Sequence, residues 1–120
     1  MYDHIGLTVK DIDASVRFYS AVLAPLGYEL CSRDSTSAGL GPKDAPALWL
    51  YQSDKARPAA THIAFSADAR KAVDGFHAAA IETGGRDNGP PGVRADYAPT
   101  YYAAFVIDPD GNNVEVVCNE

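Results

Sequence analysis

Two histidines and one glutamate are the residues most able to carry chemistry in this chain. His4 and His62 lie 58 positions apart, and Glu115 stands near the carboxyl end. Two imidazoles and one carboxylate form a recognised ligand set for a divalent ion, which leaves coordination positions open for substrate and water. We therefore predict one divalent metal ion (Fe, Mn, Zn, Ni or Co) held by His4, His62 and Glu115. Glu115 is also the candidate catalytic residue: the sequence offers no assured general base, and Glu115 could serve as one only by loosening its own ligation.

The two histidines occupy matching places in an internal repeat. The segment 4–9, HIGLTV, matches the segment 62–67, HIAFSA, in residue type at every position. Both segments alternate between small or polar residues and large apolar ones, which is typical of a half-buried strand. In a pseudo-twofold fold such strands meet near the axis, and we expect them to bring both imidazoles together.

Each repeat continues with a helix and further strands. The first helix is predicted from an Asp11 N-cap to Leu23, and the second from near Asp68 to Gly84. Strands are predicted at 28–33, 36–40, 47–52, 101–107 and 113–118, with a weaker one at 92–95. Each half is then β-α-β-β-β. The fold class is α+β, with two tandem βαβββ modules that form a curved mixed-sheet cup with helices outside.

The turn and linker residues between these elements indicate the domain organisation. Residues 1–120 are predicted to form one domain, with module one at about 1–53, a linker at 53–60 and module two at about 59–120. Asp108-Pro109-Asp110-Gly111 predicts a tight hairpin turn, because proline presets one turn angle and glycine supplies the positive φ. Residues 88–100, with three prolines, are predicted as an irregular loop at the rim of the site.

Aromatic residues supply most of the remaining candidates for a substrate pocket. Trp49 and Tyr51 share one face of their strand by alternation, so both are expected to line the cup together. Tyr97 and Tyr101 were weighed with them, against the alternative that half of these rings pack in the core. The predicted substrate-binding residues are Trp49, Tyr51, Arg94, Tyr102 and Phe105.

Composition excludes several classes of protein. The chain has 10 Lys and Arg against 16 Asp and Glu, a net charge of −6, which argues against nucleic acid or an anionic membrane as partner. No apolar run is long enough to span a membrane, and the amino-terminal residues do not resemble a secretory signal. Two distant cysteines, Cys31 and Cys118, are expected to be reduced thiols. We predict a cytoplasmic protein with a small-molecule substrate.

With these elements in place, the chain resembles the vicinal oxygen chelate superfamily. That superfamily groups glyoxalase I, bleomycin-resistance proteins, extradiol dioxygenases and fosfomycin-resistance enzymes. The resemblance covers essentially the whole chain and rests on the repeat, on the segments 3–9 and 61–65, and on the ending DPDGNNVE at 108–115. It implies the metal ligands His4, His62 and Glu115, and it suggests a homodimer.

Two departures from the family pattern leave the reaction open between lyase, isomerase and oxygenase chemistry. Glyoxalase I has a fourth ligand, a carboxylate or amide, at the position that here matches Trp49. Extradiol dioxygenases need a further histidine, but His77 is expected to be a solvated helix residue, and the matching tyrosine position holds Phe105. The alternative is a metal-free small-molecule binding protein like the bleomycin-resistance members. A metal-binding relic without turnover is a third possibility.

Overall fold

A computed structural model describes residues 1–57 and 61–120 of the chain. Module one contains the strands β1 (Ile5–Val9), β2 (Glu29–Arg33), β3 (Ser37–Gly41) and β4 (Leu48–Gln52), the helix α1 (Ile12–Leu23) and a short 3-10 helix at Ala24–Leu26. Module two contains β5 (His62–Ser66), β6 (Arg86–Val93), β7 (Tyr102–Ile107), β8 (Asn113–Cys118) and the helix α2 (Arg70–Glu82). The predicted α+β class with two βαβββ modules is confirmed. Residues 58–60 of the predicted linker lie outside the described residues.

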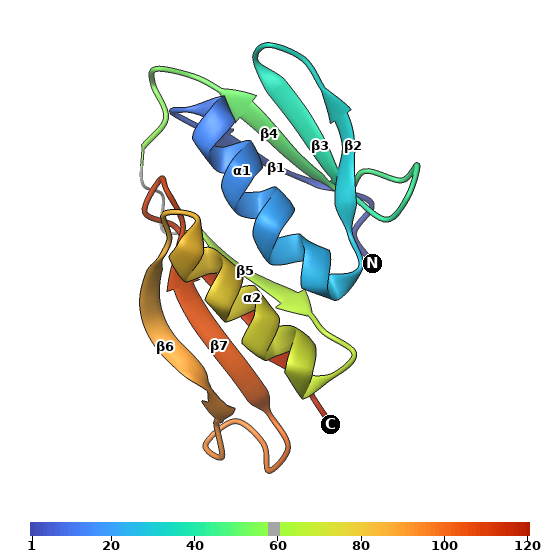
Figure 1. Ribbon diagram of the computed structural model, residues 1–120, viewed down its shortest axis with the longest axis vertical. Helices are drawn as coiled ribbons and strands as arrows, with labels where there is room; N and C mark the ends of the chain where they lie inside the picture. Colours follow the sequence, from blue (N-terminus) through green and yellow to red (C-terminus); the bar gives the residue numbers. More distant parts are fainter. Residues whose placement is uncertain (58–60) are drawn as a thin grey trace.

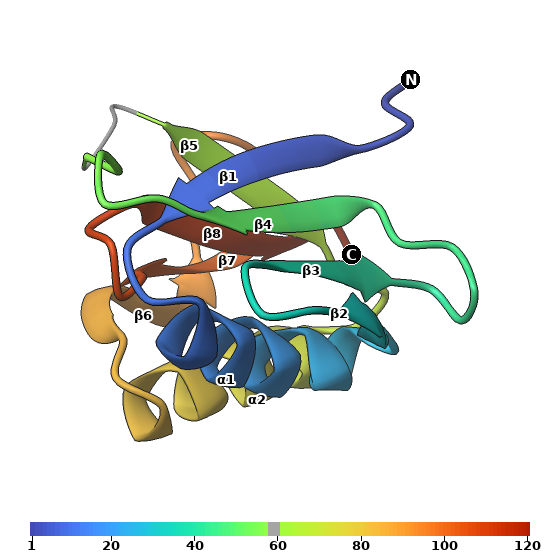
Figure 2. The same cartoon turned by 90° about the horizontal axis from the view of Figure 1, so that it is seen from above.

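The two modules have the same sheet topology. The strand order is β1-β4-β3-β2 in one sheet and β5-β8-β7-β6 in the other, with the first pair of each parallel and the remaining pairs antiparallel. Both sheets lie on the same side of the two helices, which run next to each other in opposite directions (Figures 1 and 2). None of the helices in the described ranges is long and apolar enough to cross a membrane.

The core lies between the sheets and the helices. Phe18, Tyr19 and Val22 of α1 and Phe76 of α2 are fully buried against the strand residues that point toward the helices. Each large apolar side chain buried in this way contributes roughly 1.5–3 kcal/mol to folding. Because side chains alternate along a strand, the opposite face of each sheet is left free of helix contacts, and it holds the candidate residues Trp49, Tyr51, His62, Phe105 and Glu115.

The helices begin in different ways. Asp11 caps α1 as predicted, because its side chain accepts a hydrogen bond from the Ala14 N–H at 3.1 Å. The residue before α2 is Ala69, which provides no side-chain cap. Where the helices approach, Gly75 of α2 faces Pro25, and a β-carbon on Gly75 would lie only 3.1 Å from the proline ring.

The predicted hairpin turn at residues 108–111 is present, and its aspartates form hydrogen bonds with module one. Asp108 is buried and accepts hydrogen bonds from the Tyr19 hydroxyl of α1 at 2.5 Å and from the Asn112 side chain and backbone. Asp110 accepts hydrogen bonds from the Lys10 N–H at 2.9 Å and the Ser15 hydroxyl at 3.2 Å. Burial and the neighbouring Asp108 carboxylate raise the pKa of Tyr19 well above its usual value.

The predicted irregular loop at 88–100 is only partly irregular. Residues 86–93 form β6, an edge strand, although the segment contains Pro90 and Pro91. An edge strand needs hydrogen bonds on one side only, so prolines without an N–H are tolerated there. The pairing of β6 with β7 shifts register twice, between Asp87 and Gly89 and again before Gly92. Because Pro90 and Pro91 favour a loop, the sequence did not predict this strand.

Candidate functional site

The pair His62 and Glu115 forms the centre of the candidate site. The strands β5 and β8 are parallel neighbours whose register pairs His62 with Asn113 and Ala64 with Glu115. This register puts the His62 Nε2 atom 2.9 Å from a Glu115 carboxylate oxygen, Oε2. The Glu115 side chain is 6% exposed and that of His62 is 44% exposed. A shielded carboxylate therefore lies directly behind an accessible imidazole.

The second ring nitrogen of His62 also faces an oxygen. Its Nδ1 atom lies 3.1 Å from the backbone carbonyl of Asn113. A neutral imidazole has one N–H, so donation from Nδ1 to this carbonyl leaves the lone pair of Nε2 facing the Glu115 carboxylate. Such a contact is favourable when the ring carries a second proton, or when a cation stands between nitrogen and oxygen. A histidine oriented by a backbone carbonyl is typical of metal ligands.

Tyr101 completes the surroundings of the Glu115 carboxylate. Its hydroxyl donates a short hydrogen bond to Glu115 Oε1, the carboxylate oxygen that does not face His62. This bond, with smaller contributions from burial and the negative charge of Glu115, raises the pKa of Tyr101 to about 12. The Tyr97 ring packs edge-on against the Tyr101 ring, with centroids 5.1 Å apart.

Phe105 stacks on the His62 ring, and Arg94 lies against Phe105. Phe105 is the direct neighbour of Glu115 across β7 and β8, and its ring stacks on the imidazole at 6.3 Å with an interplanar angle of 19°. The Arg94 guanidinium lies 5.5 Å from the centre of the same ring. Arg94 also donates hydrogen bonds to the carbonyls of Gly92 and Pro90, at 2.9 and 2.7 Å, which fix its position.

The structure does not bring His4 to this cluster within one chain. β1 and β5 lie side by side but run in opposite directions (Figures 1 and 2). Accordingly, Thr8 at the end of β1 shares a pocket with Thr61 before β5, whereas His4 shares another with Phe65 near the end of β5. Residues at the starts of two antiparallel strands lie at opposite ends of the pair. The prediction that the two imidazoles come together within one chain is therefore wrong.

His4 has its own polar partner. It lies just before β1 with 57% of its side chain exposed, and its Nδ1 atom is 2.6 Å from a carboxylate oxygen of Asp3. The described residues contain no group of three or more histidine, cysteine or acidic side chains that could hold a metal ion. One chain therefore supplies two donors in contact, His62 and Glu115, and a complete three-ligand site needs a ligand from elsewhere.

The predicted aromatic residues fall in three different places. Of the four aromatic residues predicted to bind substrate, only Phe105 lies in the cluster around Glu115. Trp49 and Tyr51 are on the helix-free face of module one, where their rings cover Gly39 and Gly6. Tyr102 points the other way, toward α2, where its hydroxyl donates to Asp74 at 2.6 Å, because adjacent strand residues face opposite sides.

Sequence reasoning missed two contacts of the polar residues. Tyr101 was counted among the pocket aromatics, but its bond to Glu115 was not predicted, because the two residues meet only across the β7–β8 hairpin. His77 was expected to be solvated, yet its side chain is 17% exposed and its Nε2 atom lies 2.9 Å from Asp87 on β6. This hydrogen bond, with a second from the Gly89 N–H, lowers the pKa of Asp87.

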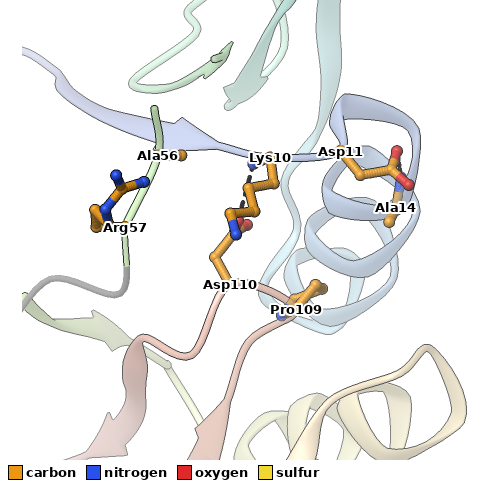
Figure 3. Close-up of a pocket in the computed structure, with 7 residues that line it drawn as sticks. All are labelled: Lys10, Asp11, Ala14, Ala56, Arg57, Pro109 and Asp110. Atoms are coloured by element: carbon orange, nitrogen blue, oxygen red, sulfur yellow. Dashed lines mark hydrogen bonds between the residues drawn. The ribbon is translucent and has the colours of Figure 1, made fainter. Parts of the chain in front are cut away.

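A separate cavity lies where the linker meets the first turn of α1 (Figure 3). Its volume is about 330 Å³, and it is lined by Lys10, Asp11, Ala14, Ala56, Arg57, Pro109 and Asp110. Figure 3 shows the hydrogen bond from the Lys10 N–H to Asp110 at its edge. None of the predicted site residues lines this cavity, so it is distinct from the cluster around Glu115.

Comparisons with known proteins agree with this fold. The family model of the Glyoxalase/Bleomycin resistance protein/Dioxygenase superfamily matches residues 2–116. The chain therefore belongs to this superfamily, whose members are small-molecule-binding proteins and enzymes. No curated protein matches the chain significantly.

Several solved structures have the same fold. A glyoxalase/bleomycin resistance protein from Albidiferax ferrireducens T118 is 28% identical, with a TM-score of 0.87 and 98% of each chain covered. A glyoxalase-related enzyme from Fulvimarina pelagi is 20% identical, with a TM-score of 0.75, covering 98% of this chain and 87% of that one. A family enzyme from Burkholderia phytofirmans PsJN is 19% identical, with a TM-score of 0.73 and 98% of each chain covered. The last two similarities concern the fold alone.

Proposed function

We propose that this chain is one subunit of a divalent-metal-dependent enzyme that acts on a small molecule with two adjacent oxygens. The observation that carries the proposal is the contact between His62 and Glu115, with the imidazole held by the Asn113 carbonyl. The 2.9 Å between Nε2 and Oε2 suits two ligands in adjacent positions on one ion, given metal–ligand bonds of about 2.1 Å at right angles.

A second copy of the chain would supply the third ligand. Because His4 lies at the opposite end of the β1–β5 pair from His62, we propose that His4 of one subunit meets His62 and Glu115 of another. The module-one face with Trp49 and Tyr51 would then cover the module-two cluster. This arrangement accounts for the three predicted ligands and for the predicted homodimer together.

The chemistry divides between the ion and the surrounding residues. A bound divalent ion would act as a Lewis acid that stabilises negative charge developing on the substrate oxygens. Glu115 would hold the ion through Oε2 and would accept a proton there only by loosening that bond, while the Asn113 carbonyl keeps the His62 ring in place. The Phe105 ring, which the Arg94 guanidinium contacts, covers one side of the imidazole and limits the access of water from that side.

Elemental analysis of the untagged protein tests metal dependence. We expect about one Fe, Mn, Zn, Ni or Co per chain, and loss of that metal in His62→Ala and Glu115→Gln. Failure of the wild type to take up any of these ions, even after reloading, would overturn the proposal.

Mixed dimers test whether the site is shared. A dimer of one His4→Ala chain and one His62→Ala chain contains one intact site, so we expect it to bind half the metal of the wild type. The matched control combines His62→Ala with Glu115→Gln, two changes on the same face, and should bind none. Absence of metal in both mixtures would refute a site shared between copies.

The second candidate function is a metal-free binding protein. It is favoured by the apolar face of module one, where Trp49 occupies the place that Glu115 has in module two. Aromatic ligands would then quench the fluorescence of Trp49, the single tryptophan, in a protein without metal. The acidic net charge and the free Cys31 and Cys118 agree with a cytoplasmic protein that binds small molecules under either function.

A further inference from the structure

The two oxygens of the Glu115 carboxylate have different surroundings. Oε2 lies 2.9 Å from His62 Nε2 and faces the accessible imidazole, whereas Oε1 accepts the hydrogen bond of the Tyr101 hydroxyl. Glu115 is 4% exposed, so its carboxylate has little contact with water. Within the described residues, His62 and Tyr101 are its only hydrogen-bond partners.

Tyr101 is itself held firmly by its own segment. Its backbone carbonyl accepts a hydrogen bond from the Arg94 N–H at 2.7 Å, and its N–H donates to the Ala98 carbonyl at 3.2 Å. These bonds close the segment 94–101 into a compact turn at the end of the β6–β7 pair. The Tyr97 ring lies edge-on against the Tyr101 ring. The hydroxyl therefore occupies a place that the backbone determines.

From this geometry we infer that Tyr101 is a positioning residue that binds Glu115 Oε1 and so presents Oε2 alone to His62 and to a metal ion. The inference rests on the proposed function for the metal, and on the structure for the contact itself. A carboxylate with one oxygen already bound acts as a ligand through the other. Without the hydroxyl, a shielded oxygen would lack a partner, and the carboxylate would rotate or bind through both oxygens.

The chain contains a matched control for this role in the next residue. Tyr102 also donates its hydroxyl to a carboxylate, Asp74 Oδ1 at 2.6 Å, but on the helix side of the sheet. Tyr101→Phe and Tyr102→Phe each remove one hydroxyl and one hydrogen bond to an acidic side chain. A purely structural role predicts similar effects of the two changes, whereas a positioning role predicts that only Tyr101→Phe alters the site.

The first measurement is metal affinity of the intact protein, with Zn²⁺ and Co²⁺ as probes. We expect Tyr101→Phe to weaken Zn²⁺ binding by about 10–100-fold, the usual cost of losing a partner of a metal ligand. We also expect it to shift the visible absorption of bound Co²⁺, which reports the number of coordinating atoms. Tyr102→Phe should leave both unchanged. Equal affinities and spectra for the two variants would overturn the inference.

The second measurement needs no metal and separates the inference from the proposed function. The ¹⁵N resonances of the His62 ring in metal-free protein report whether Glu115 Oε2 still faces Nε2. We expect Tyr101→Phe to shift them and Tyr102→Phe to leave them in place. If the wild type takes up no metal, the proposed function fails, but the role of Tyr101 is still tested by these resonances. A shift in Tyr101→Phe supports the positioning role, and the absence of a shift overturns it.

Discussion

The two modules share one backbone plan but have opposite chemistry on their helix-free faces. In module one the register places Trp49 between Gly6 and Gly39, and in module two it places Glu115 between Ala64 and Phe105. Trp49 and Glu115 are thus equivalent by register. One face presents an indole over a glycine, and the other a shielded carboxylate beside a phenylalanine.

The comparison shows which parts of a repeated fold can differ in residue type. The helix-facing sides of both sheets are apolar and buried, because both must pack against a helix. The helix-free sides do not have to pack against a helix, and their residues differ. Module two has the polar cluster of His62, Tyr101 and Glu115, whereas module one has the aromatic rings of Trp49 and Tyr51 over glycines.

The largest expected effect concerns Asp108 in the β7–β8 turn, because the equivalent β3–β4 turn of module one contains no buried carboxylate. Asp108→Asn should destabilise the protein by about 3 kcal/mol, because an amide N–H₂ would face the donors of Tyr19 and Asn112 in a buried place. Urea unfolding followed by circular dichroism measures the loss. Asp44→Asn, in the exposed β3–β4 turn, is the control and should change stability by less than about 0.5 kcal/mol. Equal effects would show that the two turns are energetically alike.

A pH titration should distinguish the module-two tyrosine that contacts Glu115. The pKa of Tyr101 is raised to about 12, so the absorbance difference between wild type and Tyr101→Phe should have its midpoint near pH 12. Because the folded pKa lies above the unfolded value of about 10, the stability from this bond is fully present below pH 10. It is lost as pH rises through 12. A midpoint near 10 would contradict the contact with Glu115.

Changing Gly39 tests the aromatic face of module one. A β-carbon there would lie 2.9 Å from the Trp49 ring, so Gly39→Ala should displace the indole and cost about 1–3 kcal/mol. The fluorescence of the single tryptophan should shift to longer wavelength. Gly6→Ala, which meets the Tyr51 ring at 3.1 Å instead, is the control and should shift the emission less. Unchanged emission in Gly39→Ala would mean that the indole does not cover Gly39.

The smallest expected effect comes from the two helix starts. Ala69→Ser should stabilise the protein by about 0.5–1 kcal/mol, because α2 lacks the side-chain cap that Asp11 gives α1. Asp11→Ala should cost a similar amount. Thermal unfolding of both variants measures the two changes, and a destabilised Ala69→Ser would show that the start of α2 needs no further cap.

Much of the fold could be predicted from the sequence because its signals are local. The alternation in 4–9 and 62–67, the Asp11 cap and the DPDG turn all depend on residues close in the chain. The shared face of Trp49 and Tyr51 also followed from the alternation of their strand. The strand β6 did not, because the pairing that makes a strand of residues 86–93 comes from β7 and overrides the prolines.

The candidate site could be predicted only in part. The sequence identified His62 and Glu115, since each stands out as a polar residue in an alternating strand. It could not show that Tyr101 and Tyr102 face opposite sides with different carboxylate partners, because that depends on the register of the β7–β8 hairpin. It also could not show that β1 and β5 run antiparallel at the junction of the modules.

The sequence by itself determined the repeated βαβββ plan and the residue types able to bind a metal or a small molecule. Local patterns of burial, capping and turns are sufficient for that. Only the tertiary structure decided which of these residues meet, because His62 lies on β5, Glu115 on β8 and Tyr101 just before β7, and the pairing of these three strands brings them together. It also decided that His4 stays apart from them within one chain, because equivalent positions on antiparallel strands lie at opposite ends.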